Sequence, residues 1–495
     1  MNGRSQIVWF GRPANSHDIR EAENRGLTII RAVDHTVDLT YARAAVFWAS
    51  TGHYEAAVTM LEEVLERSID FGLLVFIVVS DDAQFNDVER VLKRILPDAR
   101  SNHPIVLRNQ GAEPHEAPNA ALVHDCGPWP NCTLRIEGAT LTPRQELLVR
   151  RAFSDCSAVK LDLITGGLSG ATTFLVAATL TASHAGPEPS PFFAKIGPTP
   201  KLRDEMRRFR EYAEHHIEFY LRPNFQPERR LYGVRDGILV GSFVRSSGSL
   251  ADHVLQANGP QLIRSLFEET LGGLRRQANT ATTGSVVGLL EPYCRHERIP
   301  ESRVTAAMDF GKDVNPPHVL WRKLLNLPAD PWRQSAMHGD MHGENVRVRK
   351  GDAIVIDFAQ AARGPMSADL ANLEVWFAFH LASTAGITEW QARVDFMYAA
   401  EHIVASLGGG TDQARTHSDW LSDCVHEIRK LAVQSVEAPD EYLRVIAVYL
   451  LRYASFKARG ADEAADERRK TFAYWLANRL VLAICARHSA KLECA

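Results

Sequence analysis

The sequence predicts a chain of mixed α/β class with two folded regions, and three observations support this. Up to about Arg108, short apolar runs alternate with helical patterns. From about Leu141, strand-like runs are separated by tight turns. The last part contains long amphipathic segments, which predict helices. A length of 495 residues also exceeds what one hydrophobic core usually supports.

Composition narrows the classes of function. The net charge of −4, with both signs mixed along the chain, gives no overall basic footprint for nucleic acid. The seven cysteines are scattered, and their odd number argues against a disulfide framework. The N-terminus lacks the pattern of a signal peptide, and the apolar run Leu73–Val79 is too short to span a membrane. We therefore expect a cytoplasmic protein without nucleic-acid or membrane partners.

Five apolar runs in the first region predict buried strands: Ile7–Phe10, Leu27–Ile30, Ala45–Trp48, Leu73–Val79 and Pro104–Leu107. The segments between them include 54–65 and 85–96, where apolar residues recur at three- and four-residue spacing. Buried strands that alternate with helices predict a doubly wound α/β domain with a parallel sheet over residues 1–110. Residues 109–131 are rich in Pro, Asn and Gly, so we expect an interdomain linker, assigned to 111–140.

The first region resembles the receiver domains of response regulators in architecture only. Receiver chemistry requires acids after the first strand and a phosphoacceptor aspartate after the third. Here the first strand runs into Gly11–Pro13 and the third into Ala49–Gly52. Asp81 and Asp82 follow the fourth strand, and we interpret this pair as a solvated helix cap. We expect a receiver-like domain without that phosphorylation chemistry, and a protein partner for it stays open.

The second region opens with a helix, 143–153, and strands at 160–164, 172–181 and 192–196, which predict an antiparallel meander. The turn between the first two strands contains the small residues Gly166, Gly167, Ser169 and Gly170. Backbone amides in such a turn can approach an anion, although a plain hairpin would look similar. No helix follows, which argues against Rossmann and Walker loops and against a serine-hydrolase elbow.

Lys195 lies in the middle of the strand Phe192–Ile196, among apolar neighbours. An unpaired buried ammonium is costly, so the lysine either pairs with an anion or lies on an edge strand and reaches solvent. In the next helix, 201–216, Glu205 falls within the apolar stripe and needs a partner. Lys195 is our first choice for that partner, and Glu211 is the second candidate for the acid.

The segment Met337–Val346, MHGDMHGENV, admits opposite functions. Its Gly-Asp-x-His-Gly portion is typical of the first metal loop of a binuclear metallophosphatase. Its His-Gly-Asp portion followed by Asn345 is typical of a kinase-like catalytic loop. The sequence lacks the later Gly-Asn-His and Gly-Asp-x-x-Asp-Arg-Gly loops of a phosphatase. Zinc binding by His338 and His342 is disfavoured because the two glycines favour a loop. A plain polar turn is the remaining alternative.

Two downstream motifs favour the kinase-like interpretation. A short strand ends at Asp357 in I-D-F, and Gly364-Pro365 precedes Asp369-Leu-Ala at a helix start. The ordered set H-G-D-x-x-x-x-N, I-D-F and G-P-x-x-x-D-L-A resembles the aminoglycoside phosphotransferase and choline kinase family, which has a protein-kinase-like fold. GG-x-SGA and FAKIG most resemble its prokaryotic ternary-complex-associated branch. The resemblance implies a bilobal domain with an N-lobe at 141–245 and a helical C-lobe at 246–495.

The resemblance also implies ATP and Mg²⁺, and it assigns roles to residues. Asp340 orients or deprotonates the acceptor hydroxyl, and His338 and Asp369 organise the catalytic loop. The remaining predicted site residues are the magnesium ligands Asn345 and Asp357, the phosphate-pairing Lys195, its partner Glu205, and the glycine-turn residues Gly166, Gly167, Ser169 and Gly170. Residues 239–244 are the expected hinge, with backbone groups for adenine.

Three functional hypotheses stay open: a phosphotransferase, a nucleotide-binding pseudokinase scaffold, and a nucleotidyltransferase of the same fold. The intact set of Lys195, Asp340, Asn345 and Asp357 favours the first. The acceptor stays open among an aminoglycoside-like compound, an amino alcohol, a nucleoside and a protein hydroxyl. The extra N-terminal domain favours a regulatory or signalling role. The oligomeric state is not predicted.

Overall fold

The computed structural model describes the chain apart from residues 1–4, 50–51, 97–102, 110–114, 125–126, 165–169, 282–283, 330, 381–386, 409–418, 461 and 494–495. The chain forms two compact units. The first contains residues 1–203 and 224–243, and the second contains residues 204–223 and 244–495. None of the described helices is long and apolar enough to cross a membrane.

The N-terminal part of the first unit is a parallel sheet with the strand order β2-β1-β3-β4-β5. Its strands are β1 (Gln6–Gly11), β2 (Thr28–Arg31), β3 (Ala42–Ala49), β4 (Leu74–Val79) and β5 (Ile105–Asn109). All five lie where the apolar runs predict them. The helices are α1 (Ser16–Glu23), α2 (Tyr54–Asp70), α3 (Asp82–Ile95) and α4 (Glu116–Val123).

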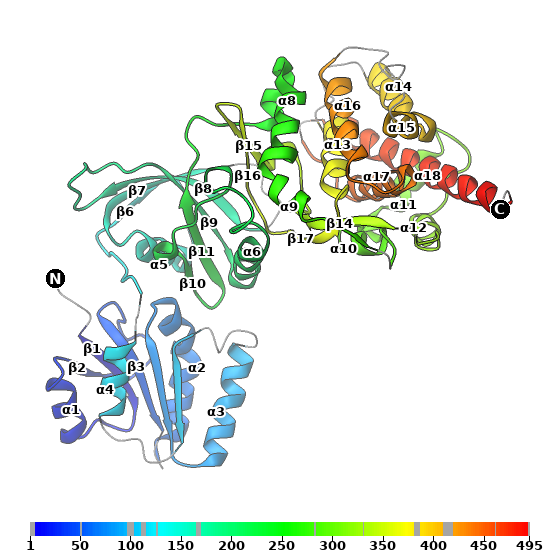
Figure 1. Cartoon of the computed structure of the whole chain (residues 1–495). Coiled ribbons are helices and arrows are strands. Elements are labelled where there is room, and N and C mark those ends of the chain that lie inside the picture. The colour runs from blue at the N-terminus through cyan, green and yellow to red at the C-terminus, as the bar shows by residue number, and fades with distance from the viewer. Residues whose placement is uncertain are drawn as a thin grey trace. The chain divides into compact units, whose positions relative to one another are not determined.

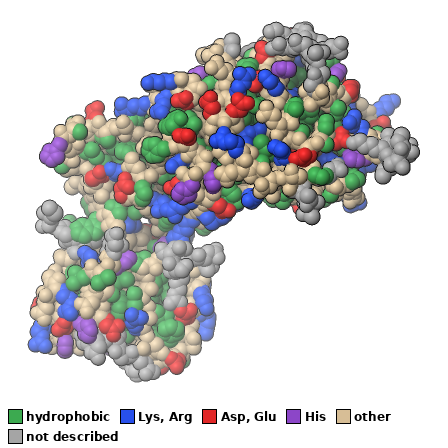
Figure 2. Space-filling model, in the orientation of Figure 1, with side chains coloured by type: hydrophobic (Ala, Val, Ile, Leu, Met, Phe, Trp, Pro, Cys, Tyr) green, Lys and Arg blue, Asp and Glu red, His purple; other side chains and the backbone are tan. Residues whose placement is uncertain are grey.

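Helices cover both faces of this sheet (Figure 1). Val8 and Phe10 pack in one core with α2 and α3, and Ile7 and Trp9 pack in a second core with α1 and α4. Period-two alternation therefore divides β1 between two apolar layers, as expected for a doubly wound domain. The comparison with receiver domains stays a prediction. Figure 2 shows both charge signs interspersed over the visible face of this domain.

The expected linker at 111–140 is wrong in part. Helix α4 lies within it, and Ala117 and Ala121 are fully buried against the sheet. The composition is typical of a linker, but small residues at four-residue spacing also pack well against a sheet. Near its end, the short strand β6 (Arg135–Glu137) already pairs with the second sheet.

The second sheet has the order β10-β11-β9-β8-β7-β6. Its longer strands are β7 (Cys156–Leu163), β8 (Thr172–Leu180), β9 (Phe192–Pro198) and β11 (Asp236–Ser242), with β10 (Leu231–Tyr232) at the edge. Strands β7, β8, β9 and β11 pair antiparallel, which confirms the predicted meander. Helix α5 (Pro143–Ala152) packs against β11, and α6 (Thr199–Tyr212) follows β9.

Within the first unit, direct contacts join the N-terminal domain to the second sheet. Asp70, the last residue of α2, accepts a 2.9 Å hydrogen bond from the amide of Val234, in the turn between β10 and β11. The guanidinium of Arg151 on α5 donates to the carbonyl of Asp70 over 2.6 Å. Asp70 is only 6% exposed. The N-terminal domain is thus attached to the second sheet through buried polar contacts.

The second unit combines two small antiparallel sheets with many helices. The sheets are β12 (Gly248–Ser249), β15 (Val346–Arg349) and β16 (Asp352–Val355), and β13 (Asn279–Ala281), β14 (Trp332–Met337) and β17 (Ala362–Pro365). The helices are α7 (Leu250–His253), α8 (Gly259–Arg264), α9 (Gly272–Arg276), α10 (Glu291–Cys294), α11 (Glu301–Ala307), α12 (Pro317–Leu325), α13 (Ala368–His380), α14 (Ile387–Met397), α15 (Ala400–Leu407), α16 (Trp420–Val433), α17 (Pro439–Ala454) and α18 (Glu463–Glu493). The many helices agree with the predicted fold class, and the predicted lobe boundaries at 141–245 and 246–495 stay a prediction.

Helix α17 is the centre of this unit. Its residues are buried almost without interruption from Asp440 to Ala454, and it packs against α13 and α18 (Figure 1). A helix that is apolar on nearly all sides must be enclosed by others. Any charged side chain on it therefore needs a polar partner.

Candidate active site

The predicted catalytic loop follows strand β14 and leads through a 3₁₀ turn, Gly343–Asn345, into β15. Gly339 has φ +78°, and a Cβ atom there would lie 2.3 Å from the carbonyl oxygen of Gln360. Only glycine fits this position without strain. The loop therefore passes directly against the segment that follows Asp357.

His338 holds the loop to that segment. Its side chain is buried, with Nε2 2.9 Å from the carbonyl oxygen of Ile356. Its Nδ1 lies 3.3 Å from the amide nitrogen of Asp340, which is a donor. The proton consequently belongs on Nε2, and both ring nitrogens are engaged. These are the contacts of a residue that positions the loop, as distinct from one that accepts a proton from substrate.

Asp369, near the start of α13, anchors the same loop from the other side. Its carboxylate accepts hydrogen bonds from the amides of His338 and Gly339, at 2.6 and 2.9 Å. Burial raises the pKa of Asp369, while His338, these amide donors and Arg275 oppose the rise. Two convergent amide donors are a typical way to hold a loop in one conformation.

Asp340 lies on this fixed loop and is partly exposed to solvent. Its side chain is 34% exposed. The guanidinium of Arg452, in the last turn of α17, donates to Asp340 Oδ1 over 2.6 Å and to the carbonyl of Gly339 over 2.9 Å. Arg452 itself is only 11% exposed. Arg452 thereby fixes the orientation of the carboxylate, and His342 Nε2 lies 3.9 Å from the second oxygen, Oδ2.

His342 has a structural environment. Its ring is stacked with Trp376, with centroids 5.9 Å apart. Burial lowers the pKa of His342 to about 4, so the ring is neutral near pH 7. A Cβ on the neighbouring Gly343 would lie 2.4 Å from the Trp376 ring. The residues that suggested a phosphatase are thus occupied with shaping the loop.

Asn345 and Asp357, the predicted metal ligands, lie on connected segments. The side-chain nitrogen of Asn345 donates to the carbonyl of Asp340 over 2.9 Å, which orients the amide. The Asn345 carbonyl accepts from the amide of Ile356 over 2.9 Å, beside Asp357. Asp357 has φ +62°, a left-handed conformation that is uncommon outside glycine. Such outliers concentrate at functional sites.

These residues suit Mg²⁺ better than a protein-only metal site. Among the described residues, no three His, Cys, Asp or Glu side chains are grouped so as to hold a metal. Mg²⁺ typically uses one or two protein oxygens and completes its shell with phosphate and water. With the Asn345 nitrogen engaged, the amide oxygen is the end available to a cation. The oxygens of Asn345 and Asp357 therefore fit Mg²⁺.

Helix α6 packs beside the Asp357 segment within the second unit. The rings of Phe209 and Phe358 meet edge to face at 5.7 Å, and Arg208 donates to the carbonyl of Ala361 over 2.7 Å. Glu205, one turn before Phe209, is 5% exposed, as its place in the apolar stripe predicts. Glu211, the second candidate, is instead on the surface, where it forms an ion pair with Arg207.

The remaining predicted residues lie in the first unit. Lys195 is 5% exposed on β9, between β8 and β11, so the edge-strand alternative is wrong. Pairing of Lys195 with Glu205 stays a prediction. Gly166, Gly167 and Ser169 lie outside the described residues. Gly170 is described and has φ +73°, a backbone conformation that favours glycine.

Arg452 is the site residue that sequence reasoning missed. A usable signal exists, because Arg452 interrupts a helix that is otherwise almost entirely apolar near its end. An arginine in such a position requires an acceptor, and a catalytic-loop acid is an obvious candidate. Its ring neighbours, Tyr293 and Tyr449, both lie 5.8 Å from the guanidinium carbon.

The loop thus presents a partly exposed aspartate, and an amide and a second aspartate lie on connected segments, an arrangement that fits the predicted phosphotransferase site. Residues 180–402 match the model of the phosphotransferase enzyme family. This match confirms the predicted resemblance and the predicted enzyme class.

Comparison with solved structures gives further similarities at low identity. An amicoumacin kinase in complex with AMP-PNP, Ca²⁺ and its ligand shares 14% identity and a TM-score of 0.38, over 64% of this chain and 87% of that one. An aminoglycoside phosphotransferase from Streptomyces rimosus shares 18% and 0.31, over 57% and 96%. A choline kinase from Cryptosporidium parvum shares 10% and 0.34, over 68% and 90%. None of the curated proteins compared with the chain matches it.

Proposed function

We propose that this chain is an ATP- and Mg²⁺-dependent phosphotransferase that moves the γ-phosphate of ATP to a hydroxyl group of a small molecule. One observation carries the proposal: a solvent-accessible Asp340 is held by Arg452 on a loop that the hydrogen bonds of His338 and Asp369 fix in place. The family match of residues 180–402 supports the same reaction class.

Asp340 performs the step at the acceptor. Its carboxylate accepts a hydrogen bond from the acceptor hydroxyl and takes its proton as the oxygen bonds to the γ-phosphorus. The bond from that phosphorus to the bridging oxygen breaks, and ADP leaves with that oxygen. His338 and Asp369 keep the loop fixed during this step through the hydrogen bonds described above. Preorganisation of this kind is most of what a kinase contributes.

Asn345 and Asp357 would hold Mg²⁺, which when bound supplies positive charge to the phosphate oxygens. The left-handed backbone at Asp357 is the strained feature expected of a residue selected for ligation. The family resemblance assigns Lys195 to the phosphates and Glu205 to Lys195. Both side chains are buried, and this assignment is part of the proposal.

A regulatory context is the second part of the proposal. Asp70 on α2 contacts the β10–β11 turn, and β11 is the neighbour of β9, which contains Lys195. A ligand or protein partner of the N-terminal domain that displaces α2 would therefore strain the sheet that contains Lys195. This contact distinguishes an integrated domain from one that is merely tethered.

Incubation with ATP labelled separately at the α and γ positions tests the function. Transfer of γ label to a hydroxyl compound, with no transfer of α label, is expected. Transfer of α label would instead establish a nucleotidyltransferase. ATP binding without turnover of either label, across a panel of sugars, amino alcohols and nucleosides, would establish a pseudokinase. Asp340→Asn is the matched control, because it retains shape and removes the charge.

A further inference from the structure

The surroundings of Asp340 on the side of α17 are basic. Arg452 is joined there by Arg295, which directly follows α10. Tyr293, two residues earlier, lies under the Arg452 guanidinium with 5.8 Å from its carbon to the ring centroid. Helix α10 also packs against α17. Arg295 thus lies two residues from a ring that Arg452 contacts, and its charge interacts with those of Arg452 and Asp340.

The charge on Arg295 is not neutralised by an ion pair. No carboxylate in the described part of the chain forms a salt bridge with it, whereas the nearby Arg298 lies 4.0 Å from Glu297. Burial lowers the pKa of Arg295, and the positive charges of Arg298 and Arg452 lower it further, while the carboxylates of Asp340 and Glu297 oppose them. Arg298 and Arg452 thus both lie within electrostatic reach of Arg295.

The backbone at Arg295 is also strained. Its φ is +49°, one of four left-handed non-glycine residues among those described, and another of the four is Asp357. A left-handed conformation disfavours a long side chain and is maintained only where the surroundings fix it. Arg295 is also exposed, so its charge is accessible to a ligand.

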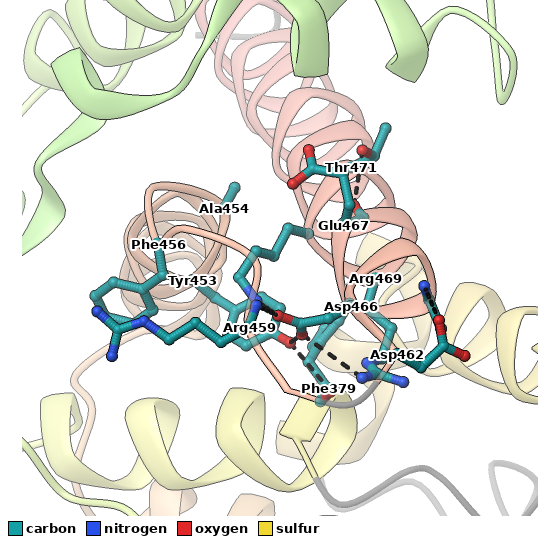
Figure 3. Close-up of polar contacts among 12 residues, drawn as sticks. Phe379, Tyr453, Ala454, Phe456, Arg459, Asp462, Asp466, Glu467, Arg469 and Thr471 are labelled. Atoms are coloured by element: carbon teal, nitrogen blue, oxygen red, sulfur yellow. Dashed lines mark hydrogen bonds and ion pairs between the residues drawn. The ribbon is translucent and has the colours of Figure 1, made fainter. Parts of the chain in front are cut away.

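The C-terminal end of α17, which contains Arg452, is held by several hydrogen bonds. Beyond Arg452, Tyr453 donates to the carbonyl of Phe379 over 3.2 Å and lies 3.5 Å from Asp466, which also accepts from the amide of Arg459 over 2.8 Å (Figure 3). Arg303 donates to the carbonyl of Phe456 over 3.0 Å. The end of α17 is therefore fixed to α11, α13 and α18, and Arg452 has little freedom to move away.

Arg452 retains binding capacity. A guanidinium has five N–H donors, and its contacts with Asp340 and Gly339 use one nitrogen each. The remaining N–H donors of Arg452, together with those of Arg295, can donate hydrogen bonds to the oxygens of a carboxylate, sulfate or phosphate. A polycationic amino sugar would instead meet repulsion at the same place.

We propose that the acceptor is a hydroxyl compound with an anionic group, received by Arg295 and Arg452 beside Asp340. Arg452 acts in addition as a positioning residue for the Asp340 carboxylate. This proposal rests on the proposed function, because it takes Asp340 as the residue that meets the acceptor. It sets aside aminoglycoside-like acceptors in favour of sugar acids, sugar phosphates and similar compounds.

Sulfate is a suitable probe, since it tests the anion site without the unknown acceptor. The full chain is saturated with AMP-PNP and Mg²⁺, which fills the nucleotide phosphate positions, and sulfate is titrated by calorimetry. Saturable binding is expected. Arg295→Gln should weaken it about tenfold, the loss of one charge-assisted hydrogen bond. Arg264→Gln, which removes an arginine paired with Glu427, should change nothing.

Arg452 is tested with two variants. Arg452→Gln should weaken sulfate binding, and Arg452→Lys should restore part of it, because the charge returns without the planar fork. Thermal unfolding of each variant separates a folding defect from a binding defect, and Arg295→Gln, at an exposed position, decides the matter if Arg452→Gln does not fold.

Absence of saturable sulfate binding, or equal binding by wild type and Arg295→Gln, would overturn the proposal. The two proposals fail separately. Turnover of γ-labelled ATP without a sulfate site refutes only the anionic acceptor. An Arg295-dependent sulfate site without any turnover refutes the phosphotransferase, and the site then binds an anion that is not a phosphoryl acceptor.

Discussion

Two regions of this chain place acidic residues directly after strands, and their acids have different environments. After β4, Asp81 caps α3 by accepting from the amide of Gln84 over 2.9 Å, and Asp82 bonds to the side chain of Asn109. Both are exposed. After β14 and β16, Asp340 is gripped by an arginine from a distant helix, and Asp357 has a left-handed backbone.

Acids of the first kind stabilise the local structure of their own helix. Acids of the second kind are held in position by residues that are distant in sequence. Asp81 satisfies an orphan amide of its own helix, which is what a helix N-cap does. Asp340 satisfies no such need, and Arg452 and the groups that fix its loop come from distant parts of the chain. At the N-terminal sheet, the position after β1 is filled by Arg12, which pairs with Asp18 at 2.8 Å.

The largest expected effect is at Asp340. Asp340→Asn should lower γ-phosphate transfer about 10³-fold, since it removes the proton acceptor. The affinity for nucleotide should change little, because Asp340 contacts the acceptor hydroxyl and not the nucleotide in the proposed reaction. Transfer rate and AMP-PNP affinity are measured in parallel, with Asp81→Asn as the matched control. Activity above a tenth of wild type in Asp340→Asn would place the reactive acid elsewhere.

Asp357 should affect nucleotide binding more than Asp340 does. Asp357→Asn retains a residue type that tolerates φ +62° but removes the charge that Mg²⁺ requires. Nucleotide affinity measured with Mg²⁺ should fall at least roughly tenfold, because each metal contact is worth several kcal/mol. Affinity measured without Mg²⁺ should stay the same. Equal Mg²⁺ dependence in the variant and in Asp82→Asn would remove Asp357 from the metal site.

Much of this contrast was accessible from the sequence. The five parallel strands are contiguous apolar runs, so each could be located without knowing its neighbours. Glu205 was identified as buried because helical periodicity is local information. The catalytic-loop motif is likewise a local pattern, and the family match supports it.

The errors and omissions share a cause, which is that they depend on contacts distant in sequence. Helix α4 looks like linker until Ala117 and Ala121 meet the sheet. Arg452 lies 112 positions from Asp340, and no local pattern joins them. Asp70 is an ordinary helix-terminal acid until the amide of Val234, 164 positions away, reaches it.

Asp70 is the acid of the N-terminal domain that differs most from Asp81. Burial raises its pKa from 3.8 to about 6, with the Val234 amide and Arg144 opposing the rise. The folded state therefore holds its proton more tightly than the unfolded state, and the resulting stability is complete below about pH 4 and lost as pH rises through 6.

Asp70→Asn retains an acceptor for Val234 and should abolish that pH dependence. Relative to the variant, wild type should lose roughly 1–3 kcal/mol of unfolding free energy between pH 4 and 6, in urea titrations of the first unit's transition. Glu66→Gln, on the same helix and partnered by Arg235, is the matched control because its pKa is lowered. Parallel pH profiles for Asp70→Asn and wild type would show that the carboxylate stays charged in this interface.

The smallest effect is expected at Asp81, and it sharpens the comparison most directly. Asp81→Ala leaves the Gln84 amide without its acceptor and should cost about 1 kcal/mol of stability. Asp81→Ser supplies another capping oxygen and should restore most of it. Neither substitution should alter γ-phosphate transfer, since this acid serves only the start of α3. A change in transfer rate with unchanged stability would show that the acids after β4 have a functional role, as the acids after β14 and β16 are proposed to have.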